Sequence, residues 1–411
     1  MRQIVVSLTA MFASLALLIA GSSLLGTLLS VRLSVEGFSP TAVGLVLVFH
    51  SVGFVIGTRL VTRVIRRVGQ IRSFAAFAAV GCAAALIHPL YVDGWLWALL
   101  RGLVGFCFAG LIVVLESWIS GRATNATRGA LLGIYQVVYF SSSALGQYLV
   151  GLGESDGYPI YNLVAILVVL SLVPLSLTRS EAPVMGTVER LGFAELYRLS
   201  PTGLIGGLAA GVAVSAFFAL APLYANQIGF GVDAVAHYMM FAVLATMLLQ
   251  WPLGRLSDLM DRRRLMAALA ALAALGGAAA AFGRISDSAL YIGTWTAFGI
   301  SGCLYPICLA MINDGMEEGN PVAASAGLLF VYGIGTCLGP VLGSLLMQAA
   351  GPAGLFQFLG GVFVLLAVYT AWRIRYTPEF PAERQGRYVS VPATEAAPAL
   401  LELDPRSEEY S

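Results

Sequence analysis

Residues 232–283 have the sequence VDAVAHYMMFAVLATMLLQWPLGRLSDLMDRRRLMAALAALAALGGAAAAFG. The stretch contains two long apolar runs, at 232–256 and 264–283, which are joined by a short charged loop. A membrane-spanning helix needs roughly 20 apolar residues, and a bilayer core admits only helices or closed barrels. Because both runs are long, continuous and rich in Ala and Leu, they predict two membrane helices and not strands.

The same pattern extends from this pair in both directions along the 411-residue chain. Twelve helices of about 20 residues would use about 240 residues and leave the rest for short loops and tails. We therefore predict an all-α polytopic membrane protein with twelve transmembrane helices. The further apolar runs lie at 3–29, 40–62, 73–92, 94–116, 129–152, 158–177, 202–225, 287–312, 321–350 and 353–373.

The composition is typical of a protein that exposes much of its surface to lipid. Hydrophobic residues make up 58% of the chain, charged residues make up only 11%, and the mean hydropathy is +0.85. A soluble domain carries about 25% charged residues, so the composition excludes a soluble enzyme of two or three domains. The five cysteines all fall inside apolar runs without metal-ligand spacing. We therefore expect them to be small core residues and predict neither disulfides nor a metal site.

Two stretches interrupt or end the apolar pattern and so divide the chain. Residues 178–201 are rich in Arg and Glu, and residues 374–411 are rich in Pro and Glu with little apolar periodicity. We predict an N-terminal six-helix bundle at 1–177, a cytoplasmic linker at 178–201, a C-terminal six-helix bundle at 202–373 and a disordered cytoplasmic tail at 374–411.

The arginines indicate the orientation, because the cytoplasmic loops of membrane proteins carry an excess of positive charge. If the N-terminus is in the cytoplasm, 20 of the 23 basic residues fall on the cytoplasmic side. The opposite side then holds only Arg32 and Arg284, and Arg101 lies within an apolar run. We therefore expect a multi-pass protein of the inner (cytoplasmic) membrane with both termini in the cytoplasm.

The second half of the chain repeats features of the first half when the sequence is shifted by 197 residues. Because each half then holds six helices, the repeats run parallel and are related by an axis along the membrane normal. The coinciding residues are Gly57 with Gly254, Arg66 with Arg263, Arg67 with Arg264, Gly102 with Gly299, Tyr135 with Tyr332 and Gly146 with Gly343.

The charged loop in the stretch quoted above begins with Gly254, has Asp258 four residues later and then has paired basic residues. This arrangement resembles the signature of the major facilitator superfamily. The copy in the first half keeps Gly57 and its paired arginines, but it has Val61 where the acid belongs. The resemblance covers about residues 1–373. It implies the major facilitator fold and transport by alternating access between the two bundles.

Further segments are similar to other motifs of this superfamily, and the resemblance gives several of them a role in gating. It implies that Asp258 accepts hydrogen bonds from the start of the run at 129–152, where Arg128 also lies, and so closes the cytoplasmic side. Simple positive-inside orientation remains the alternative role for the arginines. The similar motifs are Arg101 with Gly105, Arg128 with Gly129, and Gly335 to Gly343. The gating residues implied are Gly254, Asp258, Asp261, Arg262, Arg263, Arg128, Gly57, Arg66 and Arg67.

Three of the ionisable side chains that lie inside apolar runs are candidates for function. A lone cation as deep as Arg101 costs several kcal/mol unless it faces water, an acid or a ligand, so it either attracts an anionic group or repels protons. His50 and Glu116 can titrate, which makes them candidates for coupling transport to protons. The alternatives are a hydrogen-bonded core histidine for His50 and, for Glu116, an ion pair with Arg59 or Arg128.

Polar residues at 136, 139, 143 and 147 follow one face of the helix predicted at 129–152. In lipid such a face must turn inward, where it either lines a cavity or joins helices. We expect aromatic and hydroxyl residues of the second half to complete the cavity. The candidates for substrate binding are Arg101, Gln136, Tyr139, Ser143, Trp295 and Tyr332.

The chain contains no P-loop, phosphate-binding glycine motif or Ser/His/Asp arrangement, so we predict neither an enzyme nor ATP-driven transport, and no cofactor. The favoured function is proton-coupled export of a small organic solute by a secondary active transporter. Uptake of a small metabolite and a non-transporting membrane sensor or scaffold are the alternatives. The expected partners are the lipid bilayer, the solute and protons, without nucleic acid, and we expect a monomer.

Overall fold

The computed structural model describes residues 2–123, 127–154, 157–177, 190–282, 286–316, 321–376, 385, 386 and 388. Every regular element in these ranges is a helix. The first half contains α1 (Arg2–Val35), α2 (Pro40–Val68), α3 (Gln70–Ile87), η1 (His88–Leu90), α4 (Gly94–Ser120), α5 (Arg128–Leu149), η2 (Val150–Leu152), α6 (Tyr158–Leu170) and α7 (Leu172–Ser176). The second half contains α8 (Phe193–Leu199), α9 (Pro201–Gln227), α10 (Val232–Leu259), α11 (Arg262–Ala281), α12 (Asp287–Asp314), α13 (Pro321–Ala350) and α14 (Gly354–Tyr376).

Eleven helical segments in the described ranges are long and apolar enough to cross a membrane. The helix α5 crosses beside them as the twelfth, although polar residues such as Gln136 and Gln147 lower its hydropathy. The predicted twelve-helix, all-α fold is therefore confirmed. The run predicted at 158–177 is divided into α6 and α7 at Ser171, whose hydroxyl bonds back to the carbonyl of Val168.

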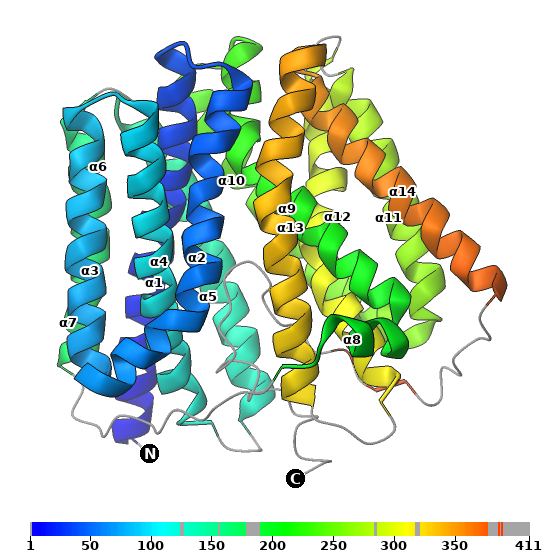
Figure 1. Ribbon diagram of the computed structural model, residues 1–411, viewed down its shortest axis with the longest axis horizontal. Coiled ribbons are helices and arrows are strands. Elements are labelled where there is room, and N and C mark those ends of the chain that lie inside the picture. The colour runs from blue at the N-terminus through cyan, green and yellow to red at the C-terminus, as the bar shows by residue number, and fades with distance from the viewer. Residues whose placement is uncertain are drawn as a thin grey trace.

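The helices form two bundles, α1–α7 and α9–α14, which stand side by side (Figure 1). Equivalent helices pack in the same pairs in each bundle: α1 with α5 and α9 with α13, α2 with α4 and α10 with α12, α3 with α6 and α11 with α14. These pairs agree with the repeat found in the sequence. The short helix α8 lies at the end of the molecule at which α1 begins, and we name this end the α8 end.

Glycines allow α2 and α4 to pack backbone against backbone. A Cβ atom on Gly53 would collide with the carbonyl of Gly102, and one on Gly105 would collide with the carbonyl of His50. A Cβ on Gly57 would come within 2.7 Å of the Cβ of Ala109. Small residues permit such close helix contacts in membranes, and here they hold His50 beside the middle of α4.

The two bundles are in direct contact at the end opposite α8. The hydroxyl of Ser34 donates to the side-chain carbonyl of Asn226 at 2.7 Å, and the hydroxyl of Ser30 donates to the carbonyl of Ala219 at 2.7 Å. Both bonds join α1 to α9. Gly44 of α2 packs so closely on α13 that an added Cβ would collide with Ser344. The bundles are therefore closed against each other at this end.

Candidate functional site

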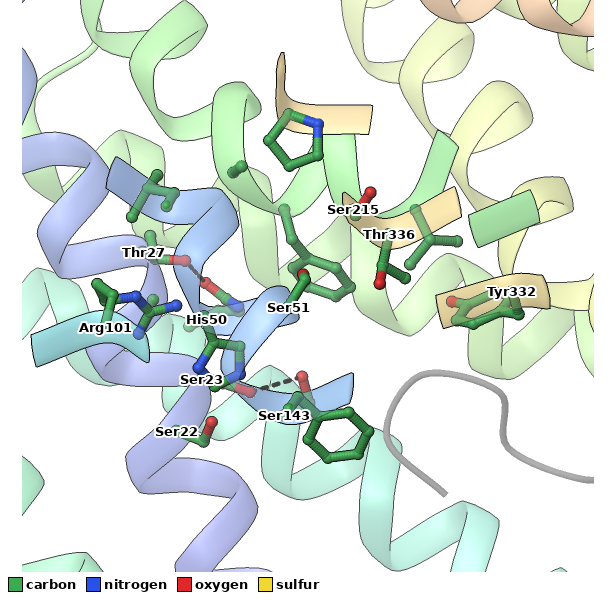
Figure 2. A pocket seen from close by; sticks show the side chains of 18 of the residues that line it. Ser22, Ser23, Thr27, His50, Ser51, Arg101, Ser143, Ser215, Tyr332 and Thr336 are labelled. Carbon is green, nitrogen blue, oxygen red and sulfur yellow. Dashed lines mark hydrogen bonds between the residues drawn. The ribbon is translucent and has the colours of Figure 1, made fainter. Parts of the chain in front are cut away.

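A cavity of about 140 Å³ lies between the two bundles, near the middle of their helices (Figure 2). Both bundles contribute to its wall, because α1, α2, α4 and α5 line one side and α9 and α13 line the other. The lining residues are Ser22, Ser23, Gly26, Thr27, Leu47, His50, Ser51, Phe54, Arg101, Tyr139, Ser143, Gln147, Val214, Ser215, Phe218, Ala219, Tyr332, Thr336 and Pro340.

The first bundle supplies the charged part of the wall. Arg101 lies two turns into α4 and is only 6% exposed, and His50 comes from the facing side of α2. Figure 2 shows the guanidinium and the imidazole at the same end of the cavity. The close packing of Gly53 and Gly105 brings the two helices together, so it also fixes the position of this pair. Arg101, a residue predicted to bind the substrate, therefore lies in the cavity wall.

The polar face of α5 both lines the cavity and joins two helices. The hydroxyls of Ser143 and Ser23 are 2.9 Å apart, and Thr27 donates to the side-chain carbonyl of Gln147 at 2.5 Å. Both hydrogen bonds link α5 to α1 (Figure 2). The two roles that the sequence left open for this face therefore occur together, and the first bundle is held as a unit.

The second bundle supplies a more apolar wall. Val214, Phe218 and Ala219 of α9 and Tyr332 of α13 line this side of the cavity. The hydroxyl of Ser215 donates to the carbonyl of Gly211 at 2.8 Å, and that of Thr336 donates to the carbonyl of Gly333 at 2.8 Å. These two hydroxyls therefore bond within their own helices, and the wall offers mainly apolar surface.

Three residues singled out in the sequence lie elsewhere. Gln136 is buried in α5 but is not part of the cavity wall. Trp295 of α12 packs against Tyr291, with ring centres 5.9 Å apart, and also lies outside the wall. Glu116 is fully buried near the α8 end of α4, where it accepts a hydrogen bond of 2.7 Å from the hydroxyl of Tyr135.

Two smaller pockets adjoin the cavity and contain residues that the sequence did not reveal. One shares Tyr139 and Phe218 with the cavity and adds Thr246 and Gln250 of α10 and Ser301 of α12. Thr246 and Gln250 are four residues apart and so share one face of α10, a helical spacing that could have identified them from the sequence. The other pocket shares Phe54, Tyr332 and Thr336 with the cavity and reaches Arg190, next to α8.

The loop between α10 and α11 forms a compact network of charges in the second bundle. The side chain of Arg262 is only 2% exposed and forms an ion pair with Asp314, the last residue of α12. It also bonds to the hydroxyl of Ser257 at 3.1 Å and to the carboxylate of Asp258 at 3.2 Å. The predicted gating arginine is therefore a buried connection between three helices.

Asp261 caps the start of α11. Its carboxylate accepts from the backbone N–H of Arg263 at 2.7 Å and pairs with the Arg263 guanidinium at 3.0 Å. Burial alone would raise the pKa of Asp261, but the hydrogen bonds and charge of Arg263 outweigh burial and lower the pKa below its ordinary value. The ionised form is therefore the one that stabilises the loop.

The depressed pKa of Asp261 predicts an acid-sensitive loop. Its contribution to stability is complete above the pKa of the unfolded chain, near 3.9, and is lost as the pH falls through the lower pKa of the folded protein. We expect Asp261→Asn, which keeps a helix-capping side chain, to lose about 1 kcal/mol at pH 7 and nothing at the lowest pH. Thermal unfolding of both proteins from pH 7 to pH 2 checks this. An equal loss at every pH would contradict it.

The first-half copy of the loop signature packs differently. Gly57 contacts α4, Val61 is fully buried in the position of the missing acid, and Arg66 and Arg67 are exposed. Arg59 lies over the ring of Phe330 on the other bundle, 4.4 Å from its centre. The side chain of Arg128 is outside the described residues, so its predicted contact with Asp258 is outside them as well.

A part of the predicted tail contacts the loop. Residues 374–376 belong to α14, and of the remainder only residues 385, 386 and 388 are described. The backbone N–H of Tyr388 donates to the carboxylate of Asp258 at 2.7 Å, and that of Gly386 donates to Asp314 at 3.0 Å. The carbonyl of Gly386 accepts from Arg262, and the Tyr388 ring covers Gly254.

Comparisons with known proteins agree on one family. The family model described as Major Facilitator Superfamily matches residues 11–249 and 239–403. The chain is 29% identical to the MFS-type transporter YcaD of Escherichia coli (strain 536) over 375 residues, which cover 90% of this chain and 96% of the relative.

Solved structures of transporters share the fold at low sequence identity. The nucleoside transporter NupG superposes with a TM-score of 0.74 at 12% identity, covering 92% of this chain and all of that one. A bacterial homologue of the human lysosomal transporter Spinster, in an inward-facing and occupied conformation, superposes with a TM-score of 0.73 at 13% identity. That match covers 92% of this chain and 96% of the other.

Proposed function

Because the chain belongs to the major facilitator superfamily, we propose that it is a secondary active transporter that carries a small organic solute through its central cavity by alternating access. The observation that carries this proposal is the polar cavity between two bundles that are closed against each other at one end. A sensor or scaffold has no need for such a cavity. The solute binds between α1, α2, α4 and α5 on one side and α9 and α13 on the other.

The conformation described here is inward-facing in this proposal. The α8 end is the cytoplasmic side, because arginines predominate there, and the contacts from Ser30 and Ser34 to α9 close the outer side. The pocket that extends from Phe54 to Arg190 is the route from the cavity to the cytoplasm. Both termini and the linker at 178–201 are then cytoplasmic, in the inner membrane.

The topology gives a direct labelling prediction. A single cysteine at Arg198, in a background without the five native cysteines, should react with a membrane-impermeant maleimide only after the cells are opened. A cysteine at Glu36, which follows α1 at the outer side, is the matched control and should react in intact cells. Labelling of position 198 from outside would contradict the orientation.

The energy source in this proposal is the proton gradient, and the direction is export. His50 lines the cavity, so its imidazole can exchange a proton with the same space that holds the solute. Glu116 is buried in α4, bonded to the hydroxyl of Tyr135, and is not part of the cavity wall. It is therefore only a second candidate for a proton site. Among the described residues of the cavity wall, His50 is the only histidine. It is therefore the first choice for the coupling site.

Transport by everted membrane vesicles tests the function as a whole. A solute that binds is first identified by its thermal stabilisation of the protein. Vesicles that contain the protein and are acidified inside should then accumulate this solute. An uncoupler should abolish the accumulation. His50→Gln should retain solute exchange without a pH gradient but lose proton-driven accumulation. Accumulation that survives the uncoupler overturns proton coupling. Failure of any solute to be bound or moved overturns the transporter itself.

Asp258 should bias the equilibrium between the two conformations. In the outward-open state its carboxylate meets the start of α5, a contact of about 1–2 kcal/mol that does not exist when the cytoplasmic side is open. Asp258→Asn keeps a side-chain carbonyl that can still accept from the backbone N–H of Tyr388, but it removes the charge that the start of α5 attracts, so it should favour the inward-open state by roughly five- to thirtyfold. Spin labels at Ala130 and Leu259, both exposed, report the distance between α5 and α10. An unchanged distance distribution would leave Asp258 without a gating role.

A further inference from the structure

The central cavity has an uneven charge that indicates the chemistry of its solute. Among the described residues that line it, Arg101 is the one side chain with a permanent charge, and none is a carboxylate. His50, the only other basic group in the wall, lies at the same end. The field inside the cavity is therefore positive at this end and is not balanced by an acid of the wall.

Burial increases the importance of this charge. Arg101 is 6% exposed and lies inside a membrane helix, where a cation is costly unless a polar or anionic group faces it. Its guanidinium presents a planar set of donors that matches a carboxylate. Hydroxyls of Ser22 and Ser51 lie on the same bundle and can donate to a second anionic oxygen.

The opposite wall has the opposite character. Val214, Phe218 and Ala219 present apolar surface, and the hydroxyls of Ser215 and Thr336 already bond to the backbone of their own helices. A solute that spans the cavity therefore meets a cation at one end and hydrocarbon at the other. A neutral sugar or an organic cation would leave one of these two walls without a suitable partner.

We propose that the solute is a small amphiphilic carboxylate, with its carboxylate at Arg101 and its apolar body against Phe218. This proposal rests on the function proposed above and adds the class of the solute. Arg101 is then the residue that determines specificity for an anion, and α9 selects the apolar group. The positive end of the cavity also disfavours entry of organic cations.

Matched probe compounds separate charge from shape. Benzoate, benzamide and benzylamine have similar size but differ in charge at pH 7. In the full-length protein we expect benzoate to raise the melting temperature, with little effect of the other two. Arg101→Gln should weaken benzoate binding by about ten- to hundredfold, as expected for loss of a charge-assisted bond. Arg32→Gln, which removes an arginine paired with Glu36 outside the cavity, is the matched control and should bind normally.

Size of the apolar group provides a second readout. Binding should strengthen from acetate to butyrate to benzoate, and Phe218→Ala should weaken benzoate more than acetate. Equal stabilisation by benzoate and benzamide, or by benzoate in the wild type and in Arg101→Gln, overturns the proposal. So does the lack of a shift with all three carboxylates. If the protein instead binds and transports neutral solutes, the transporter function stands and only the carboxylate class fails.

A second inference comes from the separate contacts of the tail. The backbone N–H of Gly386 donates to one oxygen of Asp314, and the backbone N–H of Tyr388 donates to one oxygen of Asp258. The Tyr388 ring covers Gly254. The same Asp258 oxygen also accepts from Arg262. A carboxylate held in this way turns to another segment of the chain only if the tail leaves it.

We infer that Gly386 and Tyr388 act as a clamp that competes with the start of α5 for Asp258, and so holds the protein in the inward-facing state. This second inference also rests on the alternating access proposed above. Release of the tail frees Asp258 to close the cytoplasmic side. The tail is thereby a site at which a modification or a partner protein can change the transport rate without touching the cavity.

Variants of Tyr388 separate its ring from its backbone donor. Tyr388→Phe keeps both and should resemble the wild type. Tyr388→Ala removes the ring, and Tyr388→Pro also removes the N–H that Asp258 accepts. We expect the outward-open population to rise from Tyr388→Phe to Tyr388→Ala to Tyr388→Pro, by roughly tenfold for the proline variant. The distance between spin labels at Ala130 and Leu259 measures this population.

Proteolysis tests the docking independently of the conformational equilibrium. Gly254→Ala leaves the tail sequence intact but displaces the Tyr388 ring, so trypsin should cleave the tail several times faster than in the wild type. Gly361→Ala, where an added Cβ meets no atom within 4 Å, should not change the rate. Unchanged cleavage in Gly254→Ala overturns the docking. Faster cleavage with an unchanged label distance overturns the clamp but not the transporter.

Discussion

Replacement of Arg262 by alanine should cost about 3–5 kcal/mol of unfolding free energy, the range found when one partner of a buried ion pair is removed. The Arg262 side chain is 2% exposed and its partner Asp314 is 7% exposed, so the remaining carboxylate would be left in a poorly solvated place. The same change removes the bonds to Ser257 and Asp258, which connect α10 with the start of α11. Thermal and denaturant unfolding of the purified protein measure the loss.

The neighbouring Arg264 provides the control. Arg264 is exposed, and Arg264→Ala removes the same charge from the loop as Arg262→Ala does. Its effect on the free energy of unfolding should therefore stay within about 0.5 kcal/mol. Arg262→Ala combined with Asp314→Asn should recover part of the loss, because the double variant no longer buries an unpaired carboxylate. Similar losses in the two arginine variants would mean that burial of Arg262 does not stabilise the fold.

The largest effect on transport should come from Gly53→Val. A Cβ at this position collides with the backbone carbonyl of Gly102, so α2 and α4 must move apart. Overpacking of this kind costs about 1–3 kcal/mol, and a backbone contact belongs at the upper end of that range. The separation also moves His50 away from Arg101, and an error of about 1 Å at a binding site can reduce a rate by roughly 100-fold.

Unfolding and transport should therefore change together in Gly53→Val. Gly361→Val on α14 is the matched control, because a Cβ there meets no other atom within 4 Å and the residue is far from the cavity wall. It should retain transport and lie within about 0.5 kcal/mol of the wild type. Normal transport by a stable Gly53→Val protein would show that close packing of α2 on α4 does not fix the site.

The length and apolarity of the runs made the fold predictable, because a bilayer leaves a continuous run of about 20 apolar residues few alternatives to a helix. The stripe on α5 was visible for a related reason: its polar residues recur at helical spacing. Ser143 and Gln147 could therefore be assigned to an inward face before their bonds to Ser23 and Thr27 were known.

The cavity wall was less predictable, because a sequence does not fix how a helix is rotated about its axis when the helix has only one or two inward-facing polar residues. Ser215 and Gln250 face pockets, whereas Trp295 packs against another aromatic ring outside the cavity wall. Arg262 could be assigned to the charged loop motif, but its burial could not be predicted, because it depends on Asp314, which is 52 residues away in sequence. The contacts of Tyr388 were hidden because composition alone favoured disorder for the tail.

The two ends of the transporter differ in how salt affects them. At the end opposite α8 the named contacts between the bundles, Ser34 with Asn226 and Ser30 with Ala219, are hydrogen bonds between uncharged groups. Ionic strength screens charges, with a Debye length of about 8 Å at 0.15 M and about 3 Å at 1 M, but it leaves such bonds nearly unaffected. In the orientation proposed above this end faces the medium, so its closure depends little on a salinity that the cell cannot control. In the same orientation, the exposed charges of the α8 end face a solution whose salt content the cell itself regulates.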